Sequence, residues 1–259
     1  MNTFNEDNGI DTQAKRRRNG IYFLPNAITL AALLAAFFSI TQAMAGHYER
    51  AAMWIFVSMV FDGLDGRIAR LTNSQSAFGE QLDSIVDMVS FGVAPALVAY
   101  VWQLKSLGRV GYAAAFVFCA CAALRLALFN TLIGKVDKRW FVGVPSPTAA
   151  ALVAGLIWVH HGYERLPYIQ YIALAVTLFA GLSMVVQIKF WSFKELSTSE
   201  QPVPFFVMVL AVGVLLLLFL QPSVVLFLGF LLYSLSGYCM WIWQFLRHKK
   251  KPANPIKYS

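Results

Sequence analysis

The sequence predicts an all-α fold, a polytopic membrane helix bundle with both termini in the cytoplasm. Of its 259 residues, 58% are hydrophobic and 13% are charged, and the mean hydropathy is +0.60. Soluble domains carry about 25% charged residues, so this composition excludes an ordinary soluble protein. Apolar runs of about 20 residues, the length that crosses a bilayer, recur along the chain. Aromatic residues gather near the ends of these runs, as they do at membrane interfaces.

The apolar runs divide the chain into eight expected spans between two basic ends. Residues 1–20 are polar and contain a Lys-Arg-Arg-Arg run, so we expect a disordered, basic head that leads to the membrane surface. The first span opens at Pro25, a residue that suits the first turn of a helix. Residues 247–259 form a basic cytoplasmic tail. The expected spans are residues 23–45, 49–71, 79–102, 110–132, 148–160, 168–186, 205–220 and 224–245.

The distribution of basic residues predicts how the spans are oriented. The side that holds both termini carries sixteen of the 21 Lys and Arg residues and the other side carries four, while Arg125 lies inside the fourth span. Lys and Arg are enriched in cytoplasmic loops, which assigns both termini to the cytoplasm. The net charge of +8 therefore reflects orientation, with attraction to anionic lipids added, and we expect no nucleic-acid partner.

Four aspartates stand where the second expected span ends and the third begins. Asp62 and Asp65 are three residues apart and Asp83 and Asp87 are four apart, so each pair shares one helix face. The polar loop at residues 71–78 is long enough to bring the two faces together. An aspartate near a helix end often only caps the helix or faces water. Four of them beside hydrocarbon predict instead a site for Mg²⁺ or Mn²⁺, which prefer oxygen ligands. We expect two ions, because paired ions about 3.5–4 Å apart clamp phosphoryl groups.

Residues 62–87 resemble the signature of the CDP-alcohol phosphotransferase family. The pattern is Asp-x-x-Asp-Gly-x-x-Ala-Arg, eight residues, Gly, three residues, Asp, three residues and Asp. The resemblance implies a catalytic core of six spans, here residues 21–195, in which an alcohol displaces CMP from a CDP-lipid. It leaves residues 196–246 as two additional spans, and it implies a homodimer.

The resemblance also implies roles for individual side chains. Asp87, the last aspartate, is expected to act as the catalytic base and to contact the metals loosely at most, because a metal-bound carboxylate is a weak base. Gly66 has no Cβ and lets the nucleotide approach closely. Polar residues at the start of the first span, the motif arginine and a loop hydroxyl are expected to contact the nucleotide-lipid. The expected nucleotide and lipid contacts are Asn26, Thr29, Gly63, Gly66, Arg70 and Ser76.

Segments outside the aspartate motif indicate the acceptor alcohol. Residues 87–95, 124–130, 144–147 and 192–194 are similar to segments of the membrane-embedded bacterial and archaeal phosphatidylserine synthases. The resemblance implies transfer from CDP-diacylglycerol to L-serine at the cytoplasmic face of a bacterial inner membrane. An arginine inside a span usually faces a polar cavity, although it can also reach the interface. The residues expected to bind the acceptor are Arg125, Asn130, Ser146 and Lys194.

Besides a non-enzymatic membrane scaffold, in which Asp87→Asn would change nothing measurable, two other functions remain open at this point. The first is the same reaction with glycerol 3-phosphate or an inositol compound. A phosphorylated acceptor needs several cations, and Arg125 and the loop lysines offer some. The second is a cation transporter that uses the acids as its ion path. Transporters usually place such acids near the bilayer midplane on broken helices, whereas these acids lie at one face.

Overall fold

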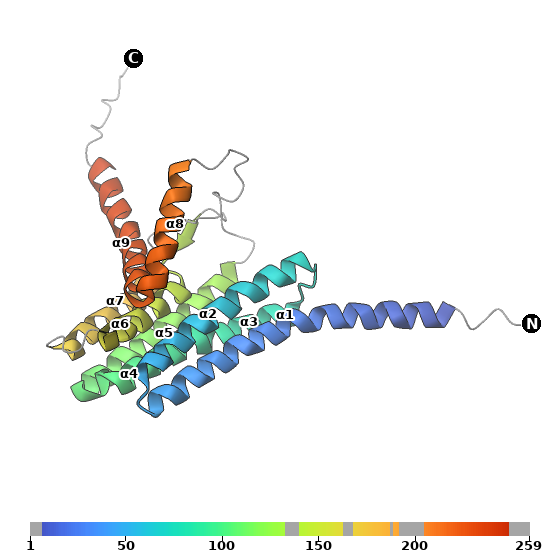
Figure 1. The fold of residues 1–259 in the computed structure, drawn as a ribbon, viewed down its shortest axis with the longest axis horizontal. Coiled ribbons are helices and arrows are strands. Elements are labelled where there is room, and N and C mark those ends of the chain that lie inside the picture. The colour runs from blue at the N-terminus through green and yellow to red at the C-terminus, as the bar shows by residue number, and fades with distance from the viewer. Residues whose placement is uncertain (1–6, 133–139, 163–167, 187–188, 192–204, 249–259) are drawn as a thin grey trace, which may run out of the picture.

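The fold is described from a computed structural model, over residues 7–132, 140–162, 168–186, 189–191 and 205–248. This part of the chain is mostly helical, with two strands of three residues each. The helices from α1 to α7 form one bundle, and α1 projects from it toward the N-terminus (Figure 1). The elements are α1 (Asp7–Met44), α2 (Tyr48–Leu71), α3 (Ala77–Asp87), η1 (Met88–Val93), α4 (Ala94–Trp102), η2 (Leu104–Leu107), α5 (Arg109–Leu132), β1 (Trp140–Val142), α6 (Ser146–Gly162), α7 (Ile169–Val185), β2 (Lys189–Trp191), α8 (Phe205–Leu220) and α9 (Pro222–His248).

Each expected span corresponds to a helical segment, and most boundaries agree within a few residues. The segment predicted at residues 205–220, for example, is α8. Within the described residues, four helical segments have the length and hydropathy to cross a membrane: Leu24–Met44, Ala77–Trp102, Arg109–Thr131 and Pro222–Trp243. The chain is therefore a membrane protein with an all-helical bundle, while the number of spans and the side of the termini stay predictions.

The first helix begins earlier than predicted. Residues 7–20 were expected to be disordered, but they form the first turns of α1, and Pro25 consequently lies inside this helix and not in its first turn. Proline is disfavoured there because it lacks an N–H group. The prediction treated Pro25 as a start signal, yet a helix that is already formed gains one hydrogen bond for each residue added. Residues 1–6 and the tail from residue 249 lie outside the described residues.

Small residues and two hydroxyl groups hold α1 against α2. Ala32 and Ala36 of α1 and Ala51 of α2 are fully buried. Ser39 Oγ donates to the Ala51 carbonyl at 2.7 Å, and Ser58 Oγ donates to the Ala32 carbonyl at 2.8 Å. Close backbone approach and hydroxyl bonds of this kind stabilise helix pairs in lipid, where the hydrophobic effect does not. The pair sets the segment of α1 around Asn26 and Thr29 beside the acidic end of α2.

The third predicted span contains a change of helix type. η1 is a π-helical stretch that follows Asp87 directly and separates α3 from α4. Pro95 contributes to it, because this residue has no N–H to donate to the carbonyl four residues earlier. π-helical turns often occur at functional sites, where they change the direction in which a side chain points.

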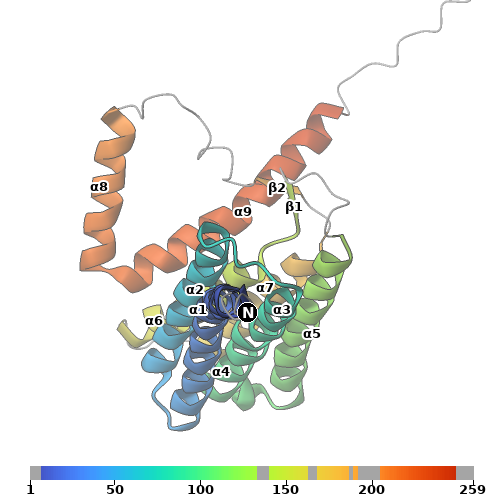
Figure 2. The ribbon, with the colours of Figure 1, turned by 90° about the vertical axis from the view of Figure 1, so that its right-hand side faces the viewer.

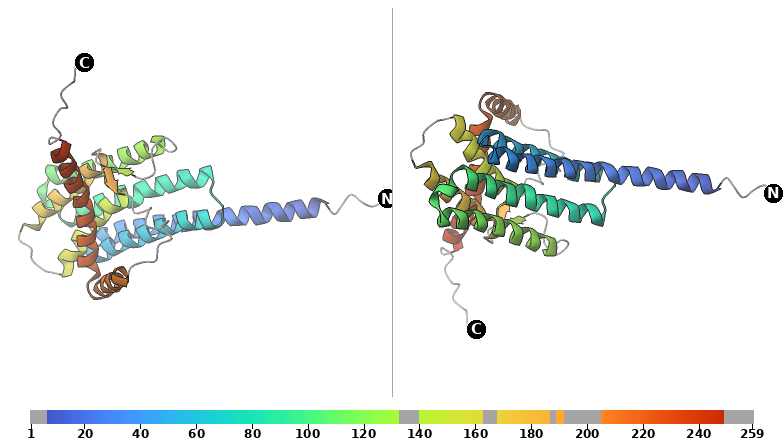
Figure 3. Two further views of the ribbon diagram at one scale, coloured as in Figure 1. Left: turned by 90° about the horizontal axis from the view of Figure 1, so that it is seen from above. Right: turned by 90° about the horizontal axis from the view of Figure 1, so that it is seen from below.

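The last two helices depart from the direction of the bundle. α8 and α9 run across the common direction of the other helices, and α8 stands apart from them (Figure 2, Figure 3). Almost all described side chains of α8 are exposed. α9 instead packs on α6, where a Cβ on Gly155 would lie 3.1 Å from Phe227 of α9. β1, which precedes α6, and β2, which follows α7, pair antiparallel, with Trp140 opposite Trp191.

Candidate active site

The candidate site lies where α2 passes into α3, at the end of the bundle from which α1 projects (Figure 1). Residues 72–76 reverse the chain. The hydroxyl groups of Thr72 and Ser74 are hydrogen-bonded at 2.6 Å, and Asn73 adopts a left-handed backbone conformation that asparagine tolerates. Ser76 caps α3, because its Oγ accepts the Gly79 N–H at 3.0 Å. This turn sets the acidic faces of α2 and α3 against each other, as the aspartate spacing predicts.

Three of the four aspartates converge. Ligand oxygens of Asp62 on α2 and of Asp83 and Asp87 on α3 all lie within 4.8 Å of one another. The carboxyl groups of Asp62 and Asp87 interact directly with each other. Like charges repel at this separation, so the cluster needs protons or cations between its oxygens.

Asp65 lies beside this cluster and not within it. Its side chain is buried, with 5% exposed, and its charge interacts with those of Asp62 and Asp83. The carboxyl group lies against the hydroxyl of Thr29 on α1. The predicted four-residue ligand set is therefore three converging residues and one neighbour in the described geometry.

The donor set fits a hard divalent cation. All the candidate ligands are carboxylates, which Mg²⁺ and Mn²⁺ prefer. Oδ2 of Asp65 and Oδ1 of Asp87 are buried and have no hydrogen-bond partner within the described residues. A buried carboxylate oxygen without a donor is costly, and a bound cation removes that cost.

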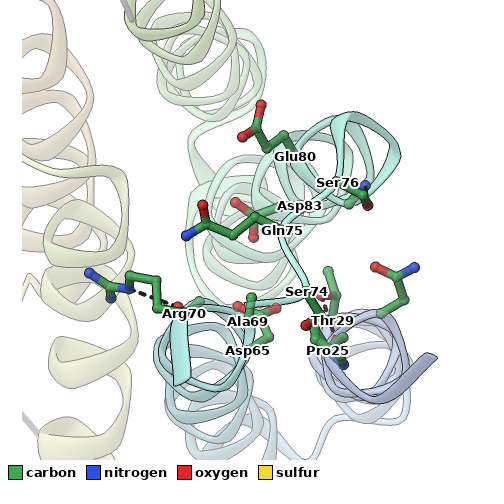
Figure 4. A pocket seen from close by; sticks show the side chains of 13 residues that line it. Pro25, Thr29, Asp65, Ala69, Arg70, Ser74, Gln75, Ser76, Glu80 and Asp83 are labelled. Carbon is green, nitrogen blue, oxygen red and sulfur yellow. Dashed lines mark hydrogen bonds between the residues drawn. The ribbon is translucent and has the colours of Figure 1, made fainter. Parts of the chain in front are cut away.

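A pocket of about 310 Å³ opens between α1, α2 and α3 next to these acids. Figure 4 shows its lining, with Asp65 of α2 beside Pro25 and Thr29 of α1, and with Asp83 and Glu80 of α3 across from them. The lining residues are Pro25, Asn26, Thr29, Asp65, Gly66, Ala69, Arg70, Ser74, Gln75, Ser76, Gly79, Glu80 and Asp83. Most of these residues have polar side chains, and one of them, Asp83, also belongs to the acidic cluster.

Most of the predicted nucleotide contacts line this pocket. Asn26 and Thr29 reach it from α1, and Gly66, Arg70 and Ser76 reach it from α2 and the turn. Gly63 is not part of the lining. A Cβ on Gly63 or on Gly66 would meet no atom within 4 Å, so the space over both glycines is open. Arg70 is exposed and its Nε donates to the Gly66 carbonyl at 2.9 Å.

The sequence reasoning missed several residues of the pocket. Gln75 and Glu80 are polar and contribute side chains to the lining (Figure 4). Their positions next to Ser76 and Gly79 in the chain are the signal that points to them. Gly79 has a further role, because a Cβ there would lie 3.2 Å from both the Asn26 Oδ1 and the Ser76 Oγ.

Of the four predicted acceptor contacts, two are bonded to each other, one is bonded to a residue next to the acidic cluster, and one lies outside the described residues. Arg125 Nη1 donates to Ser146 Oγ at 2.8 Å, and Ser146 is buried at the start of α6. The Arg125 charge interacts with Asp87, so this arginine turns inward and not toward the membrane interface. Asn130 Nδ2 donates to Ser84 Oγ at 2.8 Å, next to Asp83. Lys194 lies outside the described residues.

Comparison with known proteins agrees with this geometry. Residues 22–183 match the model of the CDP-alcohol phosphatidyltransferase family. A Helicobacter pylori protein named CDP-diacylglycerol–serine O-phosphatidyltransferase is 33% identical over 239 residues, which are 91% of this chain and 99% of that protein. Proteins of the same name from Methanocaldococcus jannaschii and Saccharomyces cerevisiae are 35% identical over 188 residues and 37% identical over 158 residues. These alignments cover 73% and 54% of this chain, and 82% and 56% of the two relatives.

The family match covers more than half of the chain and contains the acidic cluster, the pocket and the Arg125–Ser146 pair. The Helicobacter alignment extends this similarity through most of the remaining residues. Residues 22–183, which contain the converging aspartates, match a known family: the chain belongs to the CDP-alcohol phosphatidyltransferases.

Proposed function

We propose that the protein transfers the phosphatidyl group of CDP-diacylglycerol to the hydroxyl of L-serine, which yields phosphatidylserine and CMP. The observation that carries this proposal is the convergence of Asp62, Asp83 and Asp87 beside a polar pocket at one end of an apolar bundle. Such a position lets a soluble nucleotide and a lipid tail reach the same acids. The choice of serine is supported by relatives that carry the name of this reaction and align along 91% of the chain.

The pocket is assigned to the CDP part of the lipid substrate. Asn26 and Ser76 offer hydrogen-bonding groups, and Arg70 offers positive charge for a phosphate. Gly66 leaves room for the nucleotide because it has no side chain. The acyl chains remain in the surrounding membrane, against the apolar outer faces of the helices.

Two magnesium or manganese ions are proposed as cofactors. Asp62, Asp65 and Asp83 would hold them, and Asp87 would contact them loosely at most because it also serves as the base. When bound, such ions polarise the phosphoryl oxygens and neutralise the charge that develops on the pyrophosphate. The unpartnered oxygens of Asp65 and Asp87 support this assignment, as does the metal dependence of the family.

The protein side chains supply proton transfer and orientation. The serine hydroxyl is a weak nucleophile until it loses its proton. We assign that proton to Asp87, whose buried Oδ1 has no partner within the described residues. The serine oxygen then bonds to the phosphorus that carries diacylglycerol, the bond from that phosphorus to the CMP oxygen breaks, and CMP leaves with the bonding electrons. Arg125, held by Ser146, is assigned to the serine carboxylate, because one guanidinium suits a monoanion whereas a phosphate dianion requires more cations.

An acceptor panel tests this proposal. Purified full-length protein is incubated with CDP-diacylglycerol, Mg²⁺ and, in turn, serine, glycerol 3-phosphate and inositol, and CMP release is measured. Among the three acceptors, we expect only serine to give CMP release, with phosphatidylserine as the lipid product. Release with glycerol 3-phosphate but not with serine would reassign the acceptor. Divalent-cation flux into liposomes without any nucleotide turnover would indicate that the protein is a transporter and not an enzyme.

We further propose a homodimer in a bacterial inner membrane with the active site in the cytoplasm. The excess of basic residues on the side of the termini supports the orientation, and family membership supports the dimer. Single cysteines in a cysteine-free background test the orientation with a maleimide that does not cross membranes. A cysteine at Gln75→Cys is expected to react only after the membrane is permeabilised, whereas a cysteine at Ser106→Cys is expected to react in intact cells. The reverse pattern would invert the topology. Light scattering of the detergent-solubilised protein measures the oligomeric state.

A further inference from the structure

We propose that Gly92 is a positioning residue for the acceptor side of the site: its missing Cβ lets η1 pack so closely on α5 that Arg125 is held opposite Asp87. This inference deepens the proposed function and rests on the roles assigned there to Asp87 and Arg125. Gly92 is buried in η1, five residues after Asp87, and is not among the residues that line the pocket. It acts through the helix that carries the base and not through contact with a substrate.

The contact between Gly92 and α5 has no room for a methyl group. A Cβ on Gly92 would lie 3.1 Å from the Cβ of Ala122, which is fully buried. Favourable contacts between carbon atoms are about 3.5–4.0 Å long, so the two backbones would have to separate by about 0.4–0.9 Å. The Ala122 methyl is bonded directly to the α5 backbone and cannot turn aside, whereas the Met88 sulfur, 3.0 Å from the same Cβ, belongs to a flexible side chain. The clash therefore falls on the distance between η1 and α5.

α5 has little room to avoid this clash by moving alone. It packs just as closely on α7, where a Cβ on Gly181 would lie 2.9 Å from the Cα of Phe118. Phe118 lies one turn before Ala122 and is fully buried. Close-packed interiors transmit strain to their neighbours, so a methyl at Gly92 displaces η1 and α5 relative to each other.

A second contact joins the same helices on the other side of Asp87. Asn130 Nδ2 donates to Ser84 Oγ at 2.8 Å, and Ser84 lies three residues before Asp87. This contact and the one at Gly92 thus flank the base. Their α5 partners flank Arg125 in the same way, because one precedes it by three residues and the other follows it by five. The segments therefore run antiparallel, with Asp87 and Arg125 offset by about two residues, or about 3 Å along the axis. The charges of the two side chains interact accordingly.

The spacing of η1 and α5 is consequently part of the reaction geometry. Arg125, bonded to Ser146, is assigned to the serine carboxylate, and Asp87 is assigned to the proton of the serine hydroxyl. Only two carbon atoms separate these groups in serine, so the acceptor cannot follow the two side chains apart. A misplacement of about 1 Å lowers the rate of an enzyme by about 10²-fold. The pocket assigned to CDP-diacylglycerol is lined by α1, α2, α3 and the turn before α3, and not by η1 or α5.

The test compares Gly92→Ala with Gly155→Ala in the full-length enzyme. Both changes add a methyl to a close helix contact, but Gly155 lies where α6 packs on α9, with its Cβ position 3.1 Å from Phe227. For Gly92→Ala we expect kcat/KM for serine to fall about tenfold to a hundredfold with a raised KM for serine, while the KM for CDP-diacylglycerol is unchanged. Gly155→Ala is expected to leave both KM values unchanged. Addition of Ala122→Gly to Gly92→Ala removes the opposing methyl and is expected to restore the KM for serine.

A purely structural role gives a different result. Loss of stability lowers the amount of folded enzyme without changing the KM for serine, so an unchanged KM in Gly92→Ala overturns the inference while the proposed function stands. An equal rise in the KM for serine in Gly155→Ala overturns it too, as does a KM that Ala122→Gly does not restore.

A second variant decides the matter if Gly92→Ala does not fold. Ser84→Ala removes the exposed hydrogen bond from Asn130, which is the other contact that holds α5 in place. A raised KM for serine in this variant supports the inference, and an unchanged KM overturns it. If the unaltered protein releases no CMP with serine, it is the proposed function that fails.

Discussion

Replacing Asp87 with asparagine keeps the shape of the side chain and removes one of three clustered negative charges. The Asp87 carboxyl lies within 4.8 Å of those of Asp62 and Asp83, and its Oδ1 has no hydrogen-bond partner within the described residues. An amide cannot take the proton of the serine hydroxyl, and loss of a general base lowers the rate about 10²–10⁴-fold. That range corresponds to about 2.7–5.4 kcal/mol of transition-state stabilisation. We expect kcat to fall at least about 10³-fold, since a neutral ligand also weakens the cation site.

The assay measures kcat for CMP release at saturating CDP-diacylglycerol, serine and Mg²⁺. Thermal unfolding in metal-free detergent separates chemistry from folding. Because the three carboxylates repel one another, removal of one charge is expected to maintain or raise the unfolding temperature. Glu49→Gln is the matched control, since Glu49 pairs with His161 at 3.1 Å at the opposite end of α2. This variant is expected to keep kcat within about twofold, as surface ion pairs are worth little.

The reasoning about Asp87 would be refuted by a well-folded Asp87→Asn variant that keeps more than about a tenth of the wild-type kcat, because base catalysis alone contributes more than that. Loss of activity in the Glu49→Gln control to the same degree would have the same consequence, since the effect would then be common to any lost carboxylate.

Three further predictions concern binding, metal and stability. Gly79→Ala adds a Cβ 3.2 Å from the Asn26 Oδ1 and is expected to raise the KM for CDP-diacylglycerol with little change in kcat; an unchanged KM would remove Asn26 from the nucleotide site. Chelation of divalent cations is expected to abolish CMP release, and added Mg²⁺ or Mn²⁺ to restore it; activity that persists after chelation contradicts the cation site. Ser58→Ala removes the hydrogen bond from the Ser58 hydroxyl to the Ala32 carbonyl and is expected to lower the unfolding free energy by about 1 kcal/mol while activity is retained. Thermal unfolding in detergent measures this change in stability. An unchanged stability would mean that the bond adds nothing to the α1–α2 pair.

Much of the helical architecture was predictable because each helix depends on residues close together in sequence. The apolar runs predicted the main helical segments of the bundle, and the four-residue spacing of Asp83 and Asp87 predicted that both face the same cluster. The predicted start of α1 was wrong, because Pro25 lies inside a helix whose earlier turns are already formed. Gln75 and Glu80 were missed because nothing local distinguishes a polar residue that lines a pocket from one that faces water.

By itself, the sequence determined a membrane bundle, the acidic motif and the turn that joins its halves, because hydrophobicity and helical periodicity are properties of neighbouring residues. The tertiary structure alone decided that Asp65 lies beside the cluster against Thr29, that Arg125 meets Ser146, and that α9 packs on α6. These contacts join residues far apart in the chain. They depend on how closely helix backbones approach, which follows from side-chain packing across the whole bundle.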